Sequence, residues 1–134
     1  DLQTQSVLLI HHRKLDRWLQ PGGHADGEAD LLAVAQREVW EETGLKTKPL
    51  SNKIFDLDIH EIPARGQEPT HLHHDVRFLL MPEEGASLQL NEEVMDARWV
   101  PLAEVAQLCN ERSLLRMVDK SSSKKLDILA KRPM

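Results

Sequence analysis

The chain has 134 residues, 40% of them hydrophobic, which fits one globular domain with a buried core. Its formal net charge of −5 excludes a protein that coats nucleic acid or anionic membrane, because such proteins need a dominant basic field. Cys109 is the only cysteine, which excludes an internal disulfide and a cysteine zinc site and favours a reducing, cytoplasmic compartment.

The first half of the chain predicts a strand, a loop and a helix. Residues 7–10 (VLLI) are aliphatic and predict a buried strand; since this run starts so early, we expect that a preceding strand is missing from the sequence. Residues 18–28 contain a proline and three glycines and predict a loop whose backbone can approach a ligand closely. Residues 30–43 are strong helix formers, and Gly44 follows at the usual C-terminal stop position.

The second half begins with two segments, 54–62 and 70–81, that alternate between apolar and polar side chains and predict two half-buried strands of a hairpin. The polar row of this hairpin is either a solvent face or one wall of a substrate cleft. It consists of Asp56, Asp58, His60, His71, His73, Asp75 and Arg77. A last strand, two helices and a polar linker with a tail are predicted at residues 97–102, 101–108, 110–120 and 121–134. No apolar run approaches the roughly 20 residues that span a bilayer, so we expect a soluble protein.

The end of the predicted helix carries three glutamates, Glu38, Glu41 and Glu42, beside Arg37. Residues three and four apart share a helix face, where each like-charge pair costs about 0.2–0.5 kcal/mol. One interpretation is a cation held between the carboxylates. The alternative is a solvated helix end in which Arg37 pairs with Glu41, but arginine placed before glutamate is the weaker orientation. A pairing of Glu42 with Lys46 is also weak, because the helix is expected to end before Lys46.

The segment from Gly23 to Leu45 resembles the signature of the Nudix (MutT-like) hydrolases. That signature is a glycine, five residues, a glutamate, seven residues and then Arg-Glu-aliphatic-X-Glu-Glu-X-Gly-aliphatic. The matching residues are Gly23, Arg37, Glu38, Val39, Glu41, Glu42, Gly44 and Leu45. Residues 7–23 and 97–105 resemble the segments that flank this signature in the family, so the resemblance covers most of the chain.

The resemblance implies an α/β fold, specifically a Nudix-type α/β/α sandwich around a mixed β-sheet, as a single domain over residues 1–134. It also implies a pyrophosphohydrolase: a divalent-metal-dependent enzyme that hydrolyses a nucleoside diphosphate linked to another moiety. The three glutamates and Arg37 are then the catalytic residues. The glutamates hold Mg²⁺ or Mn²⁺ with the backbone carbonyl of Gly22, and Arg37 orients a metal-binding glutamate. The expected partner is a small nucleotide-type substrate, with no nucleic-acid polymer and no membrane, and the oligomeric state, including a homodimer, stays open.

The chemistry gives an independent reason for these residue types. Cleavage of a diphosphate linkage brings water to a phosphorus surrounded by negative oxygens, and a divalent cation neutralises that charge while lowering the pKa of bound water. Hard cations such as Mg²⁺ bind carboxylate oxygens, and an octahedral shell keeps positions for water and phosphate.

One position departs from the signature, because Ala29 stands where the family has its first glutamate, with Glu28 one place earlier. On a helix that begins near Glu28, this side chain would point roughly 180° away from Arg37. A non-helical chain around Gly27 would allow it to turn inward. We therefore expect Glu28 at the helix start, pointing toward the metal cleft as a ligand that acts through water or another residue. The alternative function is a catalytically impaired Nudix-fold module that senses nucleotides or binds protein.

Further candidates lie outside the signature. His24 follows the glycine pair and is either a contact to a substrate phosphate or an ordinary loop residue. Glu92 and Glu93 either add a metal ligand or the general base, or form a plain acidic loop. A zinc site in the segment HLHH is the weaker interpretation, because only two of its histidines share a strand face and no cysteine completes a set. The candidate substrate-binding residues are His24, His71, His73, Asp75 and Arg77.

Overall fold

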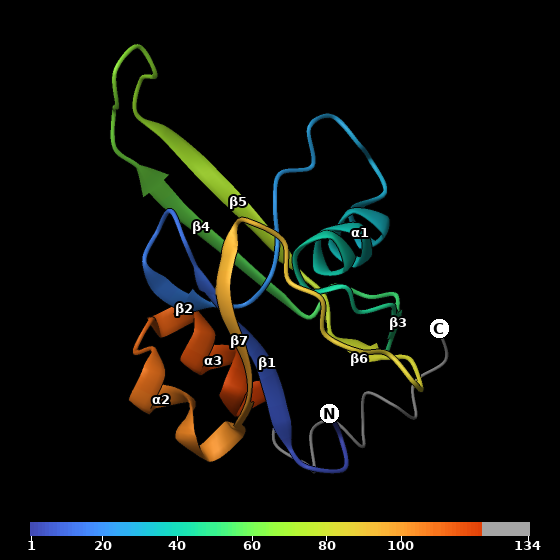
Figure 1. Cartoon of the computed structure of the whole chain (residues 1–134). Helices are drawn as coiled ribbons and strands as arrows, with labels where there is room; N and C mark the ends of the chain where they lie inside the picture. Colours follow the sequence, from blue (N-terminus) through green and yellow to red (C-terminus); the bar gives the residue numbers. More distant parts are fainter. Residues whose placement is uncertain (122–134) are drawn as a thin grey trace.

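The computed structural model describes residues 1–121 and shows an α/β fold (Figure 1). The predicted tail at residues 121–134 therefore lies, except for Ser121, outside the described residues. None of the described helices has the length and apolar character needed to cross a bilayer. In chain order the elements are β1 (Ser6–His12), β2 (Arg17–Leu19), α1 (Leu31–Thr43), β3 (Thr47–Pro49), β4 (Asp56–Ile62), β5 (His71–Arg77), β6 (Leu80–Pro82), β7 (Val94–Pro101), the 3-10 helix η1 (Leu102–Glu104), α2 (Val105–Leu108) and α3 (Arg112–Lys120).

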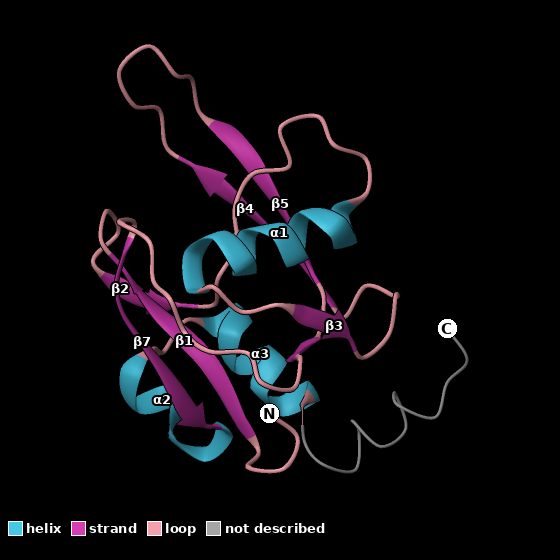
Figure 2. Ribbon diagram, turned by 45° about the vertical axis from the view of Figure 1, so that its right-hand side comes forward, coloured by secondary structure: helices cyan, strands magenta, loops and turns pink. Residues whose placement is uncertain are grey.

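Strand β1 is the centre of the core and confirms the strand predicted at residues 7–10. It pairs antiparallel with β2 on one edge and with β7 on the other. The strand is buried on both faces, since Leu9 points to one side and Leu8 and Ile10 to the other. Leu9 packs against α2 and α3 in a cluster with Val100, Val105 and Leu114. Figures 1 and 2 show α1 on the opposite side of this sheet from α2 and α3.

The predicted hairpin is present and is longer than its two named strands. Strands β4 and β5 pair antiparallel from Asp56 opposite Arg77 to Ile62 opposite His71, and β3 pairs antiparallel with β6. A backbone hydrogen bond from the Leu50 N–H to the Leu79 carbonyl joins the two regions (2.9 Å). Residues 47–62 and 71–82 therefore form one interrupted hairpin, whose loop projects away from the rest of the described chain (Figure 1).

The described strands pair only in the antiparallel sense, whereas the resemblance implied a mixed sheet. The α/β class is confirmed, but the sheet is divided into three antiparallel groups. The pairs β1–β2 and β4–β5 are antiparallel because their connections are short, whereas a parallel pair needs a crossover of about a dozen residues or more.

The β4–β5 hairpin turns its polar face toward the protein. Leu57, Ile59 and Leu72 are 57–60% exposed, while Asp56 is 2% exposed. The predicted alternation is thus confirmed, and within the polar row Asp56 is buried at the base of the hairpin whereas His60, nearer the hairpin loop, is exposed. Leu57, Ile59 and Leu72 are exposed, although a half-buried strand is expected to bury its apolar side chains.

The buried carboxylate of Asp56 explains this orientation. It accepts hydrogen bonds from Arg77 of β5 (3.0 Å) and from Lys120 (2.5 Å) and Arg116 (2.7 and 2.9 Å) of α3. Burial alone would raise the pKa of Asp56, but the hydrogen bonds from these three cations outweigh it and hold the pKa far below its usual value. The resulting stabilisation is present at neutral pH and declines as the pH falls below about 4.

Several element boundaries differ from the predictions. Helix α1 begins at Leu31, because the carboxylate of Asp30 caps it by accepting from the Ala33 N–H (3.1 Å). It ends as predicted at Gly44, whose φ of 76° is left-handed. Strand β2 was not predicted, and the helix expected at residues 101–108 begins as a 3-10 turn after Pro101, the last residue of β7.

Asp56→Asn should lower the free energy of unfolding by about 1–3 kcal/mol, because it leaves the largely buried Arg77 without its anion, whereas the partly exposed Arg116 and Lys120 can be hydrated instead. The matched control is Glu61→Gln, which makes the same charge change on an exposed residue of the same strand and should alter stability by no more than about 0.5 kcal/mol. Urea denaturation followed by circular dichroism measures both. Equal losses in the two variants would contradict the structural role of Asp56.

Candidate active site

The acidic end of α1 holds a buried carboxylate with an unused oxygen. Glu42 is 1% exposed, and its Oε1 accepts a hydrogen bond from the Gly22 N–H (2.8 Å). Its Oε2 is buried and has no hydrogen-bond partner among the described residues. Burial is the main cause that raises the pKa of Glu42 to about 7. The hydrogen bond from Gly22 lowers this pKa, and the charges of neighbouring acids raise it further. Those acids are Glu38, Glu93 and Glu41.

Gly23 allows the loop to approach the carboxylate of Glu38. A Cβ atom at Gly23 would overlap that carboxylate, whereas one at Gly22 would meet nothing within 4 Å. A side chain at Gly23 would therefore displace the Glu38 carboxylate, while the backbone of Gly23 is not left-handed. Burial raises the pKa of Glu38, and the charge of Glu41 raises it further, against the opposite effect of Arg37. The loop thus approaches Glu38 and Glu42, which are largely buried, whereas Glu41 beside them is exposed.

Arg37 bridges two of these acids loosely. Its guanidinium lies 3.7 Å from Glu38 Oε1 and 3.8 Å from Glu41 Oε1, and its side chain is 46% exposed. Exposed ion pairs of this kind stabilise by about 0–1 kcal/mol. The pair with Glu41, considered above as an explanation of the acidic cluster, does exist, but no described ion pair reaches Glu42. Arg37 is placed to orient Glu38 and Glu41 and does not explain the buried Glu42.

Two residues from other elements approach Glu42. Ligand atoms of His12, at the end of β1, and of Glu93, just before β7, lie within 4.8 Å of each other and of a Glu42 oxygen. His12 Nδ1 accepts from the Leu15 N–H (3.2 Å), which leaves the proton of a neutral ring on Nε2. His12 is therefore better suited to donate to a carboxylate than to bind an ion.

His12 was not predicted from the sequence, where it lies in an exposed-looking charged turn after the first strand. Glu92 and Glu93, the two acids before the last strand, have different surroundings. Glu93 belongs to the group around Glu42, whereas the described contact of Glu92 is made by its backbone carbonyl, which accepts from Arg13 Nε (2.8 Å).

Glu28 is placed differently from the expectation. Its side chain is exposed, and its Oε1 accepts from the Asp30 N–H (2.9 Å) within its own loop. Since α1 begins at Leu31, both Glu28 and Ala29 precede the helix, and the expectation that Glu28 starts the helix is wrong. The physical reason is that Asp30 supplies the capping carboxylate two residues later. The local bond of Glu28 does not support an orientation toward the acids.

The candidate substrate-binding residues gather on the polar face of the hairpin. The His24 ring meets the His73 ring edge to face at 5.7 Å, and His71 Nε2 lies 3.3 Å from His73 Nε2. Asp75 follows on the same face. Arg77 is oriented elsewhere, because its guanidinium donates to Asp75, to Asp56 and to the Ser113 hydroxyl. The structure thus brings His24, His71, His73 and Asp75 together and engages Arg77 in the ion cluster of Asp56.

The acidic group fits a hard divalent cation. A buried carboxylate oxygen without a protein partner is rare and needs a water, an ion or another ligand to complete its bonds. Carboxylate oxygens near one another are the donors that Mg²⁺ and Mn²⁺ prefer. A cation there would offset the burial and the acid–acid repulsion that together raise the pKa of Glu42 and of Glu38.

Comparisons with known proteins agree with this geometry. The family model described as NUDIX domain matches residues 1–120. Phosphatase NudJ of Escherichia coli (strain K12) is 34% identical over 101 residues, which are 73% of this chain and 60% of that relative. The chain therefore spans about 60% of the length of the curated relatives that it matches.

Solved structures share the fold. The E. coli dihydroneopterin triphosphate pyrophosphohydrolase superposes with a TM-score of 0.66 at 20% identity, over 87% of this chain and 85% of that one. The NUDIX domain of Shewanella oneidensis NrtR, complexed with ADP ribose, gives a TM-score of 0.53 at 20% identity, over 87% and 75% of the two chains. At these identities the likeness is one of fold alone.

The raised pKa of Glu42 predicts a pH-dependent stability in metal-free protein. An unfolded glutamate releases its proton near pH 4.3, whereas folded Glu42 keeps it to about pH 7. The free energy of unfolding should therefore fall by about 1–3 kcal/mol as the pH rises between these values. In Glu42→Gln this part of the decline should be absent. Urea denaturation in a chelator at about pH 5 and pH 8 measures the difference, and identical pH profiles for parent and variant would contradict it.

Proposed function

The chain belongs to the Nudix hydrolase family, and we propose that it hydrolyses a nucleoside diphosphate linked to another moiety at a phosphoric anhydride bond, using Mg²⁺ or Mn²⁺. The observation that carries this proposal is the buried Glu42, whose Oε2 has no partner among the described residues and whose neighbours are acids. Two proteins of the same fold, a triphosphate pyrophosphohydrolase and a NUDIX domain complexed with ADP ribose, support a substrate of this class.

In this proposal Glu38, Glu41 and Glu42 hold the divalent ion together with the backbone carbonyl of Gly22. The ion, when bound, neutralises phosphate charge and lowers the pKa of a bound water. The Gly22 N–H holds the Glu42 carboxylate in place through Oε1. Arg37 restrains Glu38 and Glu41 by its two loose ion pairs.

We assign proton transfer to Glu93. Its carboxylate is exposed and lies beside Glu42, so that it can accept a proton from a water and release it to solvent. His12, with its Nε2 proton directed by the bond at Nδ1, is suited to stabilise one of these carboxylates as a donor. Glu92 and Glu28 have no part in this mechanism.

The substrate lies, in the proposal, between the acidic helix and the polar face of the hairpin. His24 of the glycine loop is suited to contact a phosphate, and His71, His73 and Asp75 offer polar contacts from the opposite strand. Arg77 acts on this wall indirectly, by donating from Nη2 to Asp75 (3.2 Å). The specific nucleoside is set by these contacts and not by the signature helix.

The alternative is a Nudix-fold module that binds nucleotides or protein without turnover, and Ala29 in place of the signature glutamate is the feature that favours it. A panel of nucleoside triphosphates, dinucleotides and nucleotide sugars, incubated with the protein and Mg²⁺, separates the two functions. Hydrolysis of at least one member supports the enzyme, and hydrolysis of none supports the module.

For the substrate that the panel identifies, Glu42→Gln should lower kcat by about 10²–10³-fold with a much smaller change in KM, because the lost charge acts mainly on the ion and the transition state. Glu93→Gln should lower kcat in the same sense. The control Glu92→Gln, whose described contact is made by its backbone carbonyl, should retain the parent kcat. Steady-state kinetics measures all three, and full activity of Glu42→Gln would refute the metal-site proposal.

A second pair of variants tests the close approach of the glycine loop. Gly23→Ala should reduce kcat by at least about tenfold, because its Cβ must displace the Glu38 carboxylate, and misplacement by about 1 Å is costly in catalysis. Gly22→Ala adds the same methyl group where nothing lies within 4 Å and should reduce activity much less. Equal effects of the two substitutions would show that the contact with Glu38 does not matter.

A further inference from the structure

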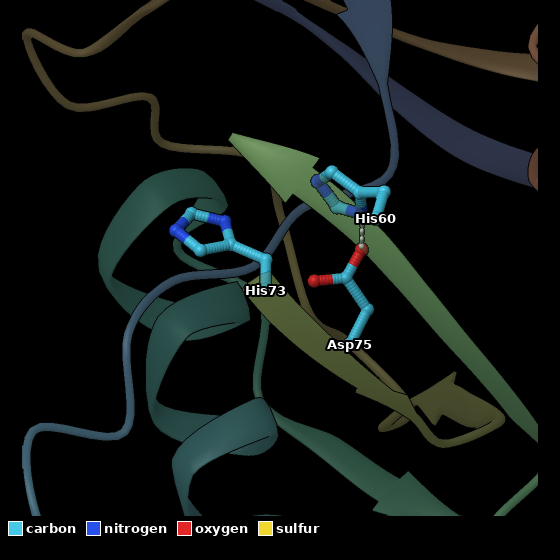
Figure 3. Close-up of side chains that lie close together, drawn as sticks. All are labelled: His60, His73 and Asp75. Atoms are coloured by element: carbon cyan, nitrogen blue, oxygen red, sulfur yellow. Dashed lines mark ion pairs between the residues drawn. The ribbon is translucent and has the colours of Figure 1, made fainter. Parts of the chain in front are cut away.

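The hairpin carries a second group of metal-ligating side chains, composed differently from the acids of α1. His60 of β4 lies directly opposite His73 of β5, and Asp75 follows two residues later on the same face. One ligand atom from each of the three lies within 4.8 Å of the others. Figure 3 shows the three side chains on the hairpin, with a dashed line for the ion pair between His60 and Asp75.

The direct contacts within this group are too long for hydrogen bonds. His60 Nδ1 lies 3.5 Å from Asp75 Oδ2 and 3.6 Å from Asp58 Oδ2, whereas a hydrogen bond between such atoms measures about 2.7–3.2 Å. Spaces of this size between donor atoms are compatible with an ion that lies between them. The group is half-buried, with the His60 side chain 43% exposed and that of Asp75 33% exposed.

Two neighbouring contacts prepare the group for an ion. Asp75 is held by Arg77 Nη2 (3.2 Å), an arginine side chain that is itself only 11% exposed, so the carboxylate keeps its direction. His71 Nδ1 lies 2.9 Å from the Pro69 carbonyl, which can only accept, so the proton of a neutral His71 is on Nδ1 and Nε2 has a free lone pair. That Nε2 lies 3.3 Å from His73 Nε2. His71 Nε2 can therefore accept a hydrogen bond from His73 Nε2–H, which leaves the other ring nitrogen of a neutral His73 free to bind an ion.

We propose that His60, His73 and Asp75 bind a transition-metal ion of the Zn²⁺ class, at a site separate from the Mg²⁺ site of the glutamates, with His71 adjoining it. Two imidazoles and one carboxylate suit Zn²⁺ and similar ions, whereas Mg²⁺ prefers oxygen ligands only. Three protein ligands leave a fourth position for water or for an oxygen of a substrate. The binding of the ion does not depend on the proposed hydrolysis.

The test uses untagged protein, because a polyhistidine tag would itself bind zinc. Zn²⁺ affinity is measured by competition with a chelating dye in millimolar Mg²⁺, which occupies the carboxylate site and competes poorly for imidazole. We expect one equivalent of Zn²⁺ to remain bound. His60→Ala should weaken the Zn²⁺ affinity by at least about 10- to 100-fold, because even the replacement of a residue that only hydrogen-bonds to a metal ligand lowers metal affinity by this much.

The matched control is His74→Ala, on the same strand and exposed, but on the face opposite to His73. It should leave the affinity unchanged. Asp75→Asn provides a second variant that weakens binding, and circular dichroism checks that each variant is folded. Zn²⁺ should also raise the melting temperature of the parent and not that of His60→Ala.

Three results would overturn the proposal: displacement of Zn²⁺ by Mg²⁺, equal losses in His60→Ala and His74→Ala, or loss of Zn²⁺ in Glu42→Gln with retention in His60→Ala. The last result would place the ion among the glutamates. None of these measurements uses turnover, so a failure of the zinc site and a failure of the proposed hydrolase activity remain distinguishable.

Discussion

The buried carboxylate of Asp56 decides which face of the β4–β5 hairpin the protein uses. Its bonds to Arg77, Arg116 and Lys120 tie the hairpin to α3 and require Asp56 to point inward. Because side chains on a strand alternate, every second residue from Asp56 and from Arg77 then faces the same way. The polar wall, and with it the histidine group, is thus a consequence of one ion cluster at the base of the hairpin. The exposed apolar row on the other side follows from the same constraint.

The acidic end of α1 places charge where folding alone would not place it. Glu42 is buried, repelled by other acids and bonded at only one of its two oxygens. Such a residue reduces stability, and a protein that stands only about 5–15 kcal/mol above unfolding keeps it where function requires it. The core around β1 compensates, since a fully buried side chain such as Leu9 stabilises by about 1.5–3 kcal/mol.

The two candidate metal sites differ in the chemistry of their donors. The glutamates of α1 offer hard oxygen ligands, and the hairpin offers two imidazoles with one carboxylate. His24 belongs to the glycine loop of the first site and touches His73 of the second, so the two groups line neighbouring parts of one region. If both proposed ions are bound, a negatively charged phosphate chain would lie between two cations and would not face the acidic helix alone.

The sequence by itself determined the signature helix, its glycine loop and the longer strands β1, β4, β5 and β7, because these depend on spacings of a few residues along the chain. The helix start was misplaced only slightly, because Asp30 and not Glu28 supplies the capping carboxylate. Only the tertiary structure decided which hairpin face is inward and which distant residues reach Glu42. Glu93 approaches it across about fifty residues of sequence, and His60 meets His73 through strand register. Such contacts depend on long-range packing and on one buried ion cluster, neither of which leaves a periodic pattern in the sequence.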